Sequence, residues 1–237
     1  FTAKGDLNLA NVVYKSASLP DDLSLSKMEF EFSPQNLALT ELDAKMGSSD
    51  FKMSGTIDNY LGYALRDEPL KGDFDFKSNN LDLDRLTGTS EVSSPDVSTA
   101  ASTAESAPEL LLLPDNINFN LATTIGKIKY NGIYVKNVKG NVRLAEETAI
   151  LENLTMDAMG GRIGLTGAYN TQDHSKAALN FGYKLEGIDI QELVNNFVTF
   201  GKLAPVMKYA HGKISSNFEM KSDLTSSFEP ILGSLTS

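Results

Sequence analysis

Two pairs of aspartates have the spacing that acid–base or metal chemistry requires. Asp73 and Asp75 lie two residues apart, as do Asp82 and Asp84. Residues two apart on a strand share a face, where two acids can hold one proton or a cation. Both pairs alternate with Phe or Leu, however, which is typical of the solvated face of a strand. The stretch "NNLDLDRL" also lacks the glycine and distant glutamate of a calcium loop. We expect no metal site here.

The remaining residue types offer little for catalysis. His174 and His211 are the only histidines, each stands alone among turn residues, and the chain has no cysteine. Their spacing matches neither a zinc site nor a nucleophile–base triad. We expect both histidines to be solvated, and we expect a protein that is not an enzyme and needs no cofactor.

The glycine-rich stretch "MDAMGGRIGLTGAY", residues 156–169, is a candidate phosphate loop. Gly160, Gly161, Gly164 and Gly167 do not fit the GxGxxG spacing, and a phosphate cradle needs a helix N-terminus directly after it. Instead the apolar and polar residues alternate onward as in a strand. The stretch therefore predicts a corner in which one strand turns into the next.

Charge and hydropathy exclude several classes of partner. The chain has 21 Lys and Arg against 31 Asp and Glu, a formal net charge of −10, and no basic run. This argues against nucleic acid and against electrostatic docking on anionic headgroups. No apolar run approaches the roughly 20 residues of a membrane helix. We interpret the chain as a fragment of a longer protein, with membrane contact only through segments outside this sequence.

Alternation with a period of two predicts the fold. Stretches such as "KMEFEF", "KGDFDFKS", "INFNLA" and "ALNFGYKL" are apolar on one side and polar on the other, and turn residues interrupt them every 8–12 residues. This pattern is typical of half-buried antiparallel strands. We predict a mainly β protein, a repeated antiparallel meander forming a curved, one-sided amphipathic sheet or groove. Its candidate apolar-face residues are Phe30, Phe32, Phe74, Phe76, Phe119, Leu121, Val142, Leu144, Ile163, Leu165, Phe181 and Tyr183.

The pattern occurs twice, which suggests an internal repeat. At an offset of 112, Leu39, Leu42 and Gly55 align with Leu151, Leu154 and Gly167, and residues 74–86 align with 181–193 at an offset of 107. We predict a first β unit over 1–86, a second over 110–210, and the start of a further, truncated unit over 211–237. Residues 87–109 are rich in Ser, Thr and Ala and predict a flexible surface loop, with a recognition segment as the alternative.

One helical stretch stands out after the second set of strands. In "DIQELVNNFVTFGKLAPVMKYAHG", Asp189 suits an N-cap and Glu192 completes a capping box. Pro205 suits the start of a second short helix, so a helix pair is predicted near 189–210. It would either pack on the sheet or form a lid over a binding groove.

Several of these stretches resemble the AsmA family. They are "LTMDAMGGRIGLTGAYN", "ELDAKMGSSDFKMSGTID", "LKGDFDFKSNNLDLDRL", "LNFGYKLEGIDIQEL" and the Pro-led "LPDNINFNLATTIGKIKYNGIYVKNVKGNVRL". That family, with its TamB-like relatives, comprises large envelope proteins of Gram-negative bacteria. The resemblance implies a periplasmic β body on an inner-membrane anchor, a role in outer-membrane biogenesis, and phospholipid carried along an apolar groove. The family has no catalytic residues to carry over.

The physical argument leaves two functions open. A sheet with one apolar face must cover it. In the first function the face holds acyl chains, since each methylene kept from water is worth about 0.8 kcal/mol and a chain of about 16 carbons roughly 12 kcal/mol. In the second the face closes into a packed core, and the protein is a structural module that contacts other envelope proteins.

Overall fold

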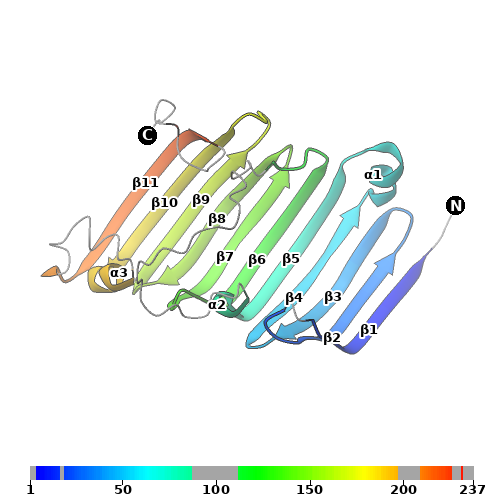
Figure 1. Cartoon of the computed structure of the whole chain (residues 1–237), viewed down its shortest axis with the longest axis horizontal. Coiled ribbons are helices and arrows are strands. Elements are labelled where there is room, and N and C mark those ends of the chain that lie inside the picture. The colour runs from blue at the N-terminus through cyan, green and yellow to red at the C-terminus, as the bar shows by residue number, and fades with distance from the viewer. Residues whose placement is uncertain (1–3, 17–18, 87–111, 197–208, 226–230, 232–237) are drawn as a thin grey trace, which may run out of the picture.

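The computed structural model describes residues 4–16, 19–86, 112–196, 209–225 and 231. These residues form one open sheet of eleven strands whose order in space is their order in the chain (Figure 1). The prediction of a mainly β, one-sided meander is confirmed. The strands are β1 Gly5–Tyr14, β2 Leu23–Phe32, β3 Asn36–Met46, β4 Ser49–Asp58, β5 Leu70–Asp82, β6 Ile117–Tyr130, β7 Ile133–Ala145, β8 Thr148–Ala158, β9 Gly161–Asn170, β10 Ala177–Asp189 and β11 Lys213–Leu224.

Strand β6 runs parallel to β5, which departs from the predicted antiparallel pattern. Leu70 lies beside Ile117 and Asp82 beside Lys129, whereas every other neighbouring pair in this sheet is antiparallel. A parallel pair needs a crossover connection of a dozen or more residues, and residues 83–116 supply the length. The predicted flexible loop at 87–109 falls within this connection but outside the described residues.

The same β-bulge occurs in both halves of the sheet. Between β3 and β4 the register shifts between Leu39 and Leu42, and between β8 and β9 it shifts between Leu151 and Leu154. In each case two residues oppose a single residue of the partner strand, so two leucines three apart in sequence face the same side. The repeated spacing of leucines in the sequence is therefore the signature of a repeated bulge.

Both clusters of buried apolar side chains lie at one end of the strands. Two short helices lie there, α2 Leu83–Leu86 and α3 Ile190–Asn196, while α1 Tyr60–Arg66 lies at the other end (Figure 1). Leu83 and Leu86 pack against a cluster of Leu81, Ile125 and Val138. On α3, Leu193 belongs to a second cluster with Ala158, Met159 and Ile188. No helix in the described part of the chain is long and apolar enough to cross a membrane.

The glycine-rich stretch is the corner between β8 and β9, as predicted. Met159 and Gly160 form its turn with φ of 49° and 70°, and Ala158 pairs with Gly161. Glycine is required at 161 because a methyl group there would lie 2.4 Å from the carbonyl oxygen of Glu186 on β10. These glycines therefore serve a hairpin turn and a close strand contact.

The N-cap predicted for α3 is confirmed, but the full capping box is not formed. Asp189 Oδ1 accepts hydrogen bonds from the backbone N–H groups of Gln191 (2.8 Å) and Glu192 (3.0 Å). The backbone N–H of Asp189, which Glu192 would bind in a capping box, instead donates to the carbonyl of Met159 (2.9 Å). This bond ties the helix start to the β8–β9 corner. The second helix predicted after Pro205 lies largely outside the described residues.

Candidate functional site

The pairing register places all twelve candidate residues on one side of the sheet, which we call the apolar face. Residues paired across neighbouring strands point to the same side. The middle row of this face contains one residue from each strand. From β1 to β11 its members are Leu7, Phe30, Leu39, Gly55, Phe74, Leu121, Val142, Leu151, Gly167, Phe181 and Met220.

The other candidates lie in the adjacent rows of the same face. Phe32, Phe119 and Leu144 belong to the row nearer α1, where Gly72 pairs with Phe119 and Phe119 with Leu144. On the opposite side of the middle row, Phe76 pairs with Met53, and Leu165 pairs with Tyr183. Ile163 pairs with Met156 and Leu185 one row further on. The apolar face thus extends several residues along the strands as well as across all of them.

The middle row crosses the sheet at right angles to the strands. With strands about 4.8 Å apart, its ten steps from β1 to β11 cover about 48 Å. The two glycines in the row, Gly55 and Gly167, each lie beside a phenylalanine, Phe74 and Phe181 respectively. No charged or polar side chain interrupts this row among the described strands.

Aromatic contacts join neighbouring strands on this face. Phe74 meets Phe119 edge-on, with ring centroids 5.6 Å apart, across the parallel β5–β6 pair. Near the other edge, Tyr183 on β10 stacks on Phe218 of β11 at 5.5 Å. Such pairs contribute beyond their apolar area. They also keep these rings in contact with the next strand.

The middle of the apolar face is only partly covered. Phe32 remains 43% exposed and Val142 38%, and the other candidate residues are half-buried. In the part of the chain that the structure describes, all strands belong to a single sheet, so no second sheet packs on this face. Contiguous apolar surface of this extent marks binding or association sites on proteins.

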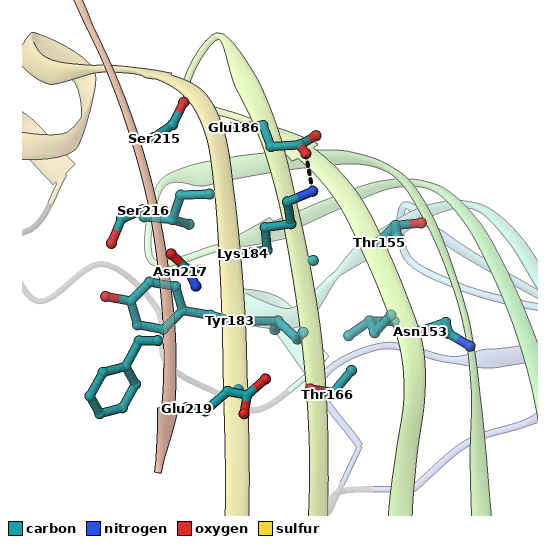
Figure 2. A pocket seen from close by; sticks show the side chains of 16 residues that line it. Asn153, Thr155, Thr166, Tyr183, Lys184, Glu186, Ser215, Ser216, Asn217 and Glu219 are labelled. Atoms are coloured by element: carbon teal, nitrogen blue, oxygen red, sulfur yellow. Dashed lines mark ion pairs between the residues drawn. The ribbon is translucent and has the colours of Figure 1, made fainter. Parts of the chain in front are cut away.

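The opposite face is polar, and hollows lie over both ends of the sheet. One has a volume of about 800 Å³ and lies over β1–β3, lined by Asp6, Asn8, Glu29, Glu31 and Thr40 among others. The other, of about 710 Å³, lies over β8–β11. Figure 2 shows the second hollow, in which Lys184 and Glu186 form an ion pair of 2.6 Å. Gly164 and Gly182 line this hollow with backbone alone.

The two pairs of aspartates lie in different surroundings, and only Asp82 and Asp84 hydrogen-bond to the backbone at the end of β5. Asp73 and Asp75 are exposed on the polar face. Asp82 accepts a hydrogen bond from the backbone N–H of Arg85 (3.2 Å) at the start of α2. Asp84 accepts one from the backbone N–H of Asn131 (2.5 Å), in the turn between β6 and β7. This hydrogen bond is the main reason why the pKa of Asp84 lies below its ordinary value.

The two histidines lie on the surface. His174 contacts Glu147 at 2.5 Å with its side chain largely exposed, and His211 is also exposed. Among the described residues, no group of three His, Asp or Glu side chains is arranged to hold a metal ion.

Asp50 has a structural role that the sequence pattern did not reveal. Its carboxylate accepts hydrogen bonds from the backbone N–H groups of Asn79 (2.9 Å) and Asn80 (2.8 Å) and from the side chain of Asn79 (2.8 Å). Burial acts to raise the pKa of Asp50, but these bonds outweigh it and the pKa lies below its ordinary value. The carboxylate thereby joins β4 to β5 beyond Lys52 and Lys77, the last pair of their ladder. The long sequence separation of these partners explains why local spacing gave no signal.

No family model, curated protein or solved structure matches this chain. The resemblance to the AsmA family accordingly enters below as part of a proposal.

Proposed function

We propose that this chain is a non-enzymatic segment of an AsmA-like envelope protein whose apolar face holds or conducts the acyl chains of phospholipids. In this proposal the segment lies in the periplasm, its parent protein is anchored in the inner membrane, and its role belongs to outer-membrane biogenesis. The observation that supports it is the middle row, an uninterrupted apolar track across all eleven strands.

The dimensions and energetics suit acyl chains. Half of a bilayer core is about 15 Å thick, so a row of about 48 Å can hold roughly three chain lengths end to end. Each methylene of an acyl chain that stays on the apolar face avoids a free-energy cost of about 0.8 kcal/mol for its exposure to water. Because every strand supplies an apolar step, a chain can move along the row without crossing a polar barrier.

Photo-crosslinking on matched positions tests the proposal. A photoreactive residue is placed at Phe30, Phe119 or Phe181 on the apolar face, and at Glu31, Asn120 or Asn180, the adjacent residue of the same strand on the polar face. After gentle purification and irradiation, mass spectrometry identifies the adducts. We expect phospholipid adducts at the three phenylalanine positions and none at the controls. Absence of lipid adducts, together with absence of co-purified lipid, would rule out the proposal.

A second variant separates this function from the alternative of a structural module with a closed core. Phe181→Asp places a charge on the apolar face, and Asn180→Asp places one on the polar face of the same strand. If the face binds lipid, Phe181→Asp leaves the chain folded by circular dichroism and abolishes lipid retention. If the face is instead covered by protein, Phe181→Asp unfolds the chain, and crosslinks from this face join protein.

A further inference from the structure

Four lysines that are scattered in the sequence gather on the polar face over β5, β6 and β7. They are Lys77, Lys127, Lys136 and Lys139, which we call the lysine cluster. Lys77 and Lys139 both pair with Thr124, which lies between them on β6. Lys127 pairs directly with Lys136 in the neighbouring row. Because neighbouring strands lie about 4.8 Å apart, the cluster spans about 10 Å across the sheet.

An irregularity of the strands brings the two rows of the cluster to the same side. On β7 the register with β8 shifts between Lys136 and Lys139, so these residues, three apart in sequence, share a face. On β6, Ile125 and Ile128 both belong to the buried cluster beneath α2. Lys127, the residue before Ile128, therefore points to the opposite, polar side.

The lysine cluster carries a repulsion that the chain does not neutralise. Like charges directly opposite each other on paired strands destabilise a sheet, and Lys127 lies opposite Lys136. In the described part of the chain none of the four lysines forms an ion pair. Asp157, opposite Lys136 on β8, is engaged by Asn137 (2.8 Å) and Arg162 (3.3 Å). This is notable in a chain with 31 acidic and 21 basic residues.

The surroundings of the cluster suit an anion that approaches from solvent. The ammonium group of Lys127 lies 4.5 Å from the ring centroid of Tyr134, a cation–π contact that holds it on this face. Thr124 is exposed between Lys77 and Lys139, and its hydroxyl can donate a hydrogen bond. Gly126, between the two rows, is also exposed and has no side chain to block access. Ammonium and hydroxyl groups are common ligands of phosphate oxygens.

We propose that the lysine cluster binds a compact anion with two or three linked phosphate groups. A single phosphate ester carries at most about two negative charges, so four lysines match a ligand with more than one phosphate. The ligand binds on the polar face, and its binding is independent of acyl chains on the apolar face.

The charge of the rest of the molecule favours a compact ligand over an extended one. The hollow over β1–β3 on the same face is lined by Asp6, Glu29 and Glu31, and the net charge of the chain is −10. A nucleic acid or an anionic membrane laid along the polar face would meet these carboxylates. A compact anion stays close to the lysines, and screening over about 8 Å at physiological salt shields it from more distant charges.

Isothermal titration of the full chain with tripolyphosphate at low salt tests the proposal. We expect one binding site whose affinity falls as salt is added. Lys127→Gln combined with Lys136→Gln should lower the affinity about tenfold or more, and Lys77→Gln combined with Lys139→Gln should do the same. Lys71→Gln combined with Lys221→Gln removes the same charge from the polar face outside the cluster and should leave the affinity unchanged.

Thermal denaturation supplies a second measurement that a purely structural role would not predict. Without ligand, Lys127→Gln combined with Lys136→Gln should raise the midpoint, because it removes the repulsion between these residues. Tripolyphosphate should raise the midpoint of the parent chain and not that of this variant.

Three results would overturn the proposal. The first is no binding of tripolyphosphate. The second is a loss of affinity that is equal in the control variant, or absent from either cluster variant. The third is binding to vesicles of phosphatidylglycerol without binding to tripolyphosphate, which would assign the cluster to a surface of lipid headgroups.

Discussion

Gly55 lies directly opposite Phe74 across β4 and β5, and a methyl group on Gly55 would lie 2.5 Å from a ring carbon of Phe74 and 2.4 Å from the carbonyl oxygen of Asp73. Its counterpart in the second half, Gly167, lies opposite Phe181 in the same row. There the nearest atom to an added methyl group is the carbonyl oxygen of Asn180 at 3.4 Å. The two glycines align in sequence, yet only the first has no room for a side chain.

We therefore expect opposite tolerance at the two glycines. Gly55→Ala should lower the free energy of unfolding by about 1–3 kcal/mol, because the methyl group must displace backbone atoms. Gly167→Ala should change it by less than about 0.5 kcal/mol. Urea denaturation of the two variants measures both values. Equal losses would contradict this account of the β4–β5 contact.

Asp50 should make the stability of the chain depend on acid pH. Its pKa is lower in the folded state than its ordinary value of 3.8. Its contribution is therefore complete above that value and is lost as pH falls through the folded-state pKa. Denaturation measured at several pH values between neutral and acidic should show the loss.

The Asp50→Asn variant isolates this contribution. We expect it to lower the free energy of unfolding at neutral pH by about 1.5–3 kcal/mol, since hydrogen bonds to a charged group are lost, and to flatten the acid dependence. Asp75→Asn, on the exposed polar face of β5, serves as the control and should change neither. If both variants behave alike, Asp50 does not join β4 to β5 in solution.

The N-cap of α3 can be tested with a second matched pair of variants. Asp189→Ala removes the acceptor for the N–H groups of Gln191 and Glu192 and should cost about 1 kcal/mol. Glu192→Ala should cost little, because the N–H of Asp189 already donates to Met159. Thermal denaturation followed by circular dichroism compares the two. A larger loss for Glu192→Ala would show that the capping box forms after all.

On the apolar face, we expect substitutions at buried positions to lower stability and substitutions at exposed positions to reduce lipid binding. Ile188 is fully buried under α3. Its substitution by alanine should lower the free energy of unfolding by about 2–5 kcal/mol. Val142→Asn, in the exposed middle row, should leave the free energy of unfolding within about 1 kcal/mol of the parent and reduce the phospholipid retained after purification. Unfolding by Val142→Asn would instead indicate that protein covers this face.

The sequence was most informative where structure depends on near neighbours. Alternation placed Phe30, Val142 and Phe181 on one face, because side chains of a strand alternate strictly between its two sides. The corner at Gly160 and the cap at Asp189 were also predictable, since a turn or a helix start is encoded within a few residues. The spacing of Leu39 and Leu42, by contrast, became intelligible as a bulge only from the register with β4.

Pairing between distant segments was decided by the tertiary structure alone. The parallel join of β5 to β6 and the bonds of Asp50 to Asn79 and Asn80 involve partners that no local pattern specifies. The sequence by itself determined which side chains share a face. Only the fold decided that the rows on that face align across all eleven strands, because alignment depends on register, and register is set jointly by turns, bulges and the neighbouring strand.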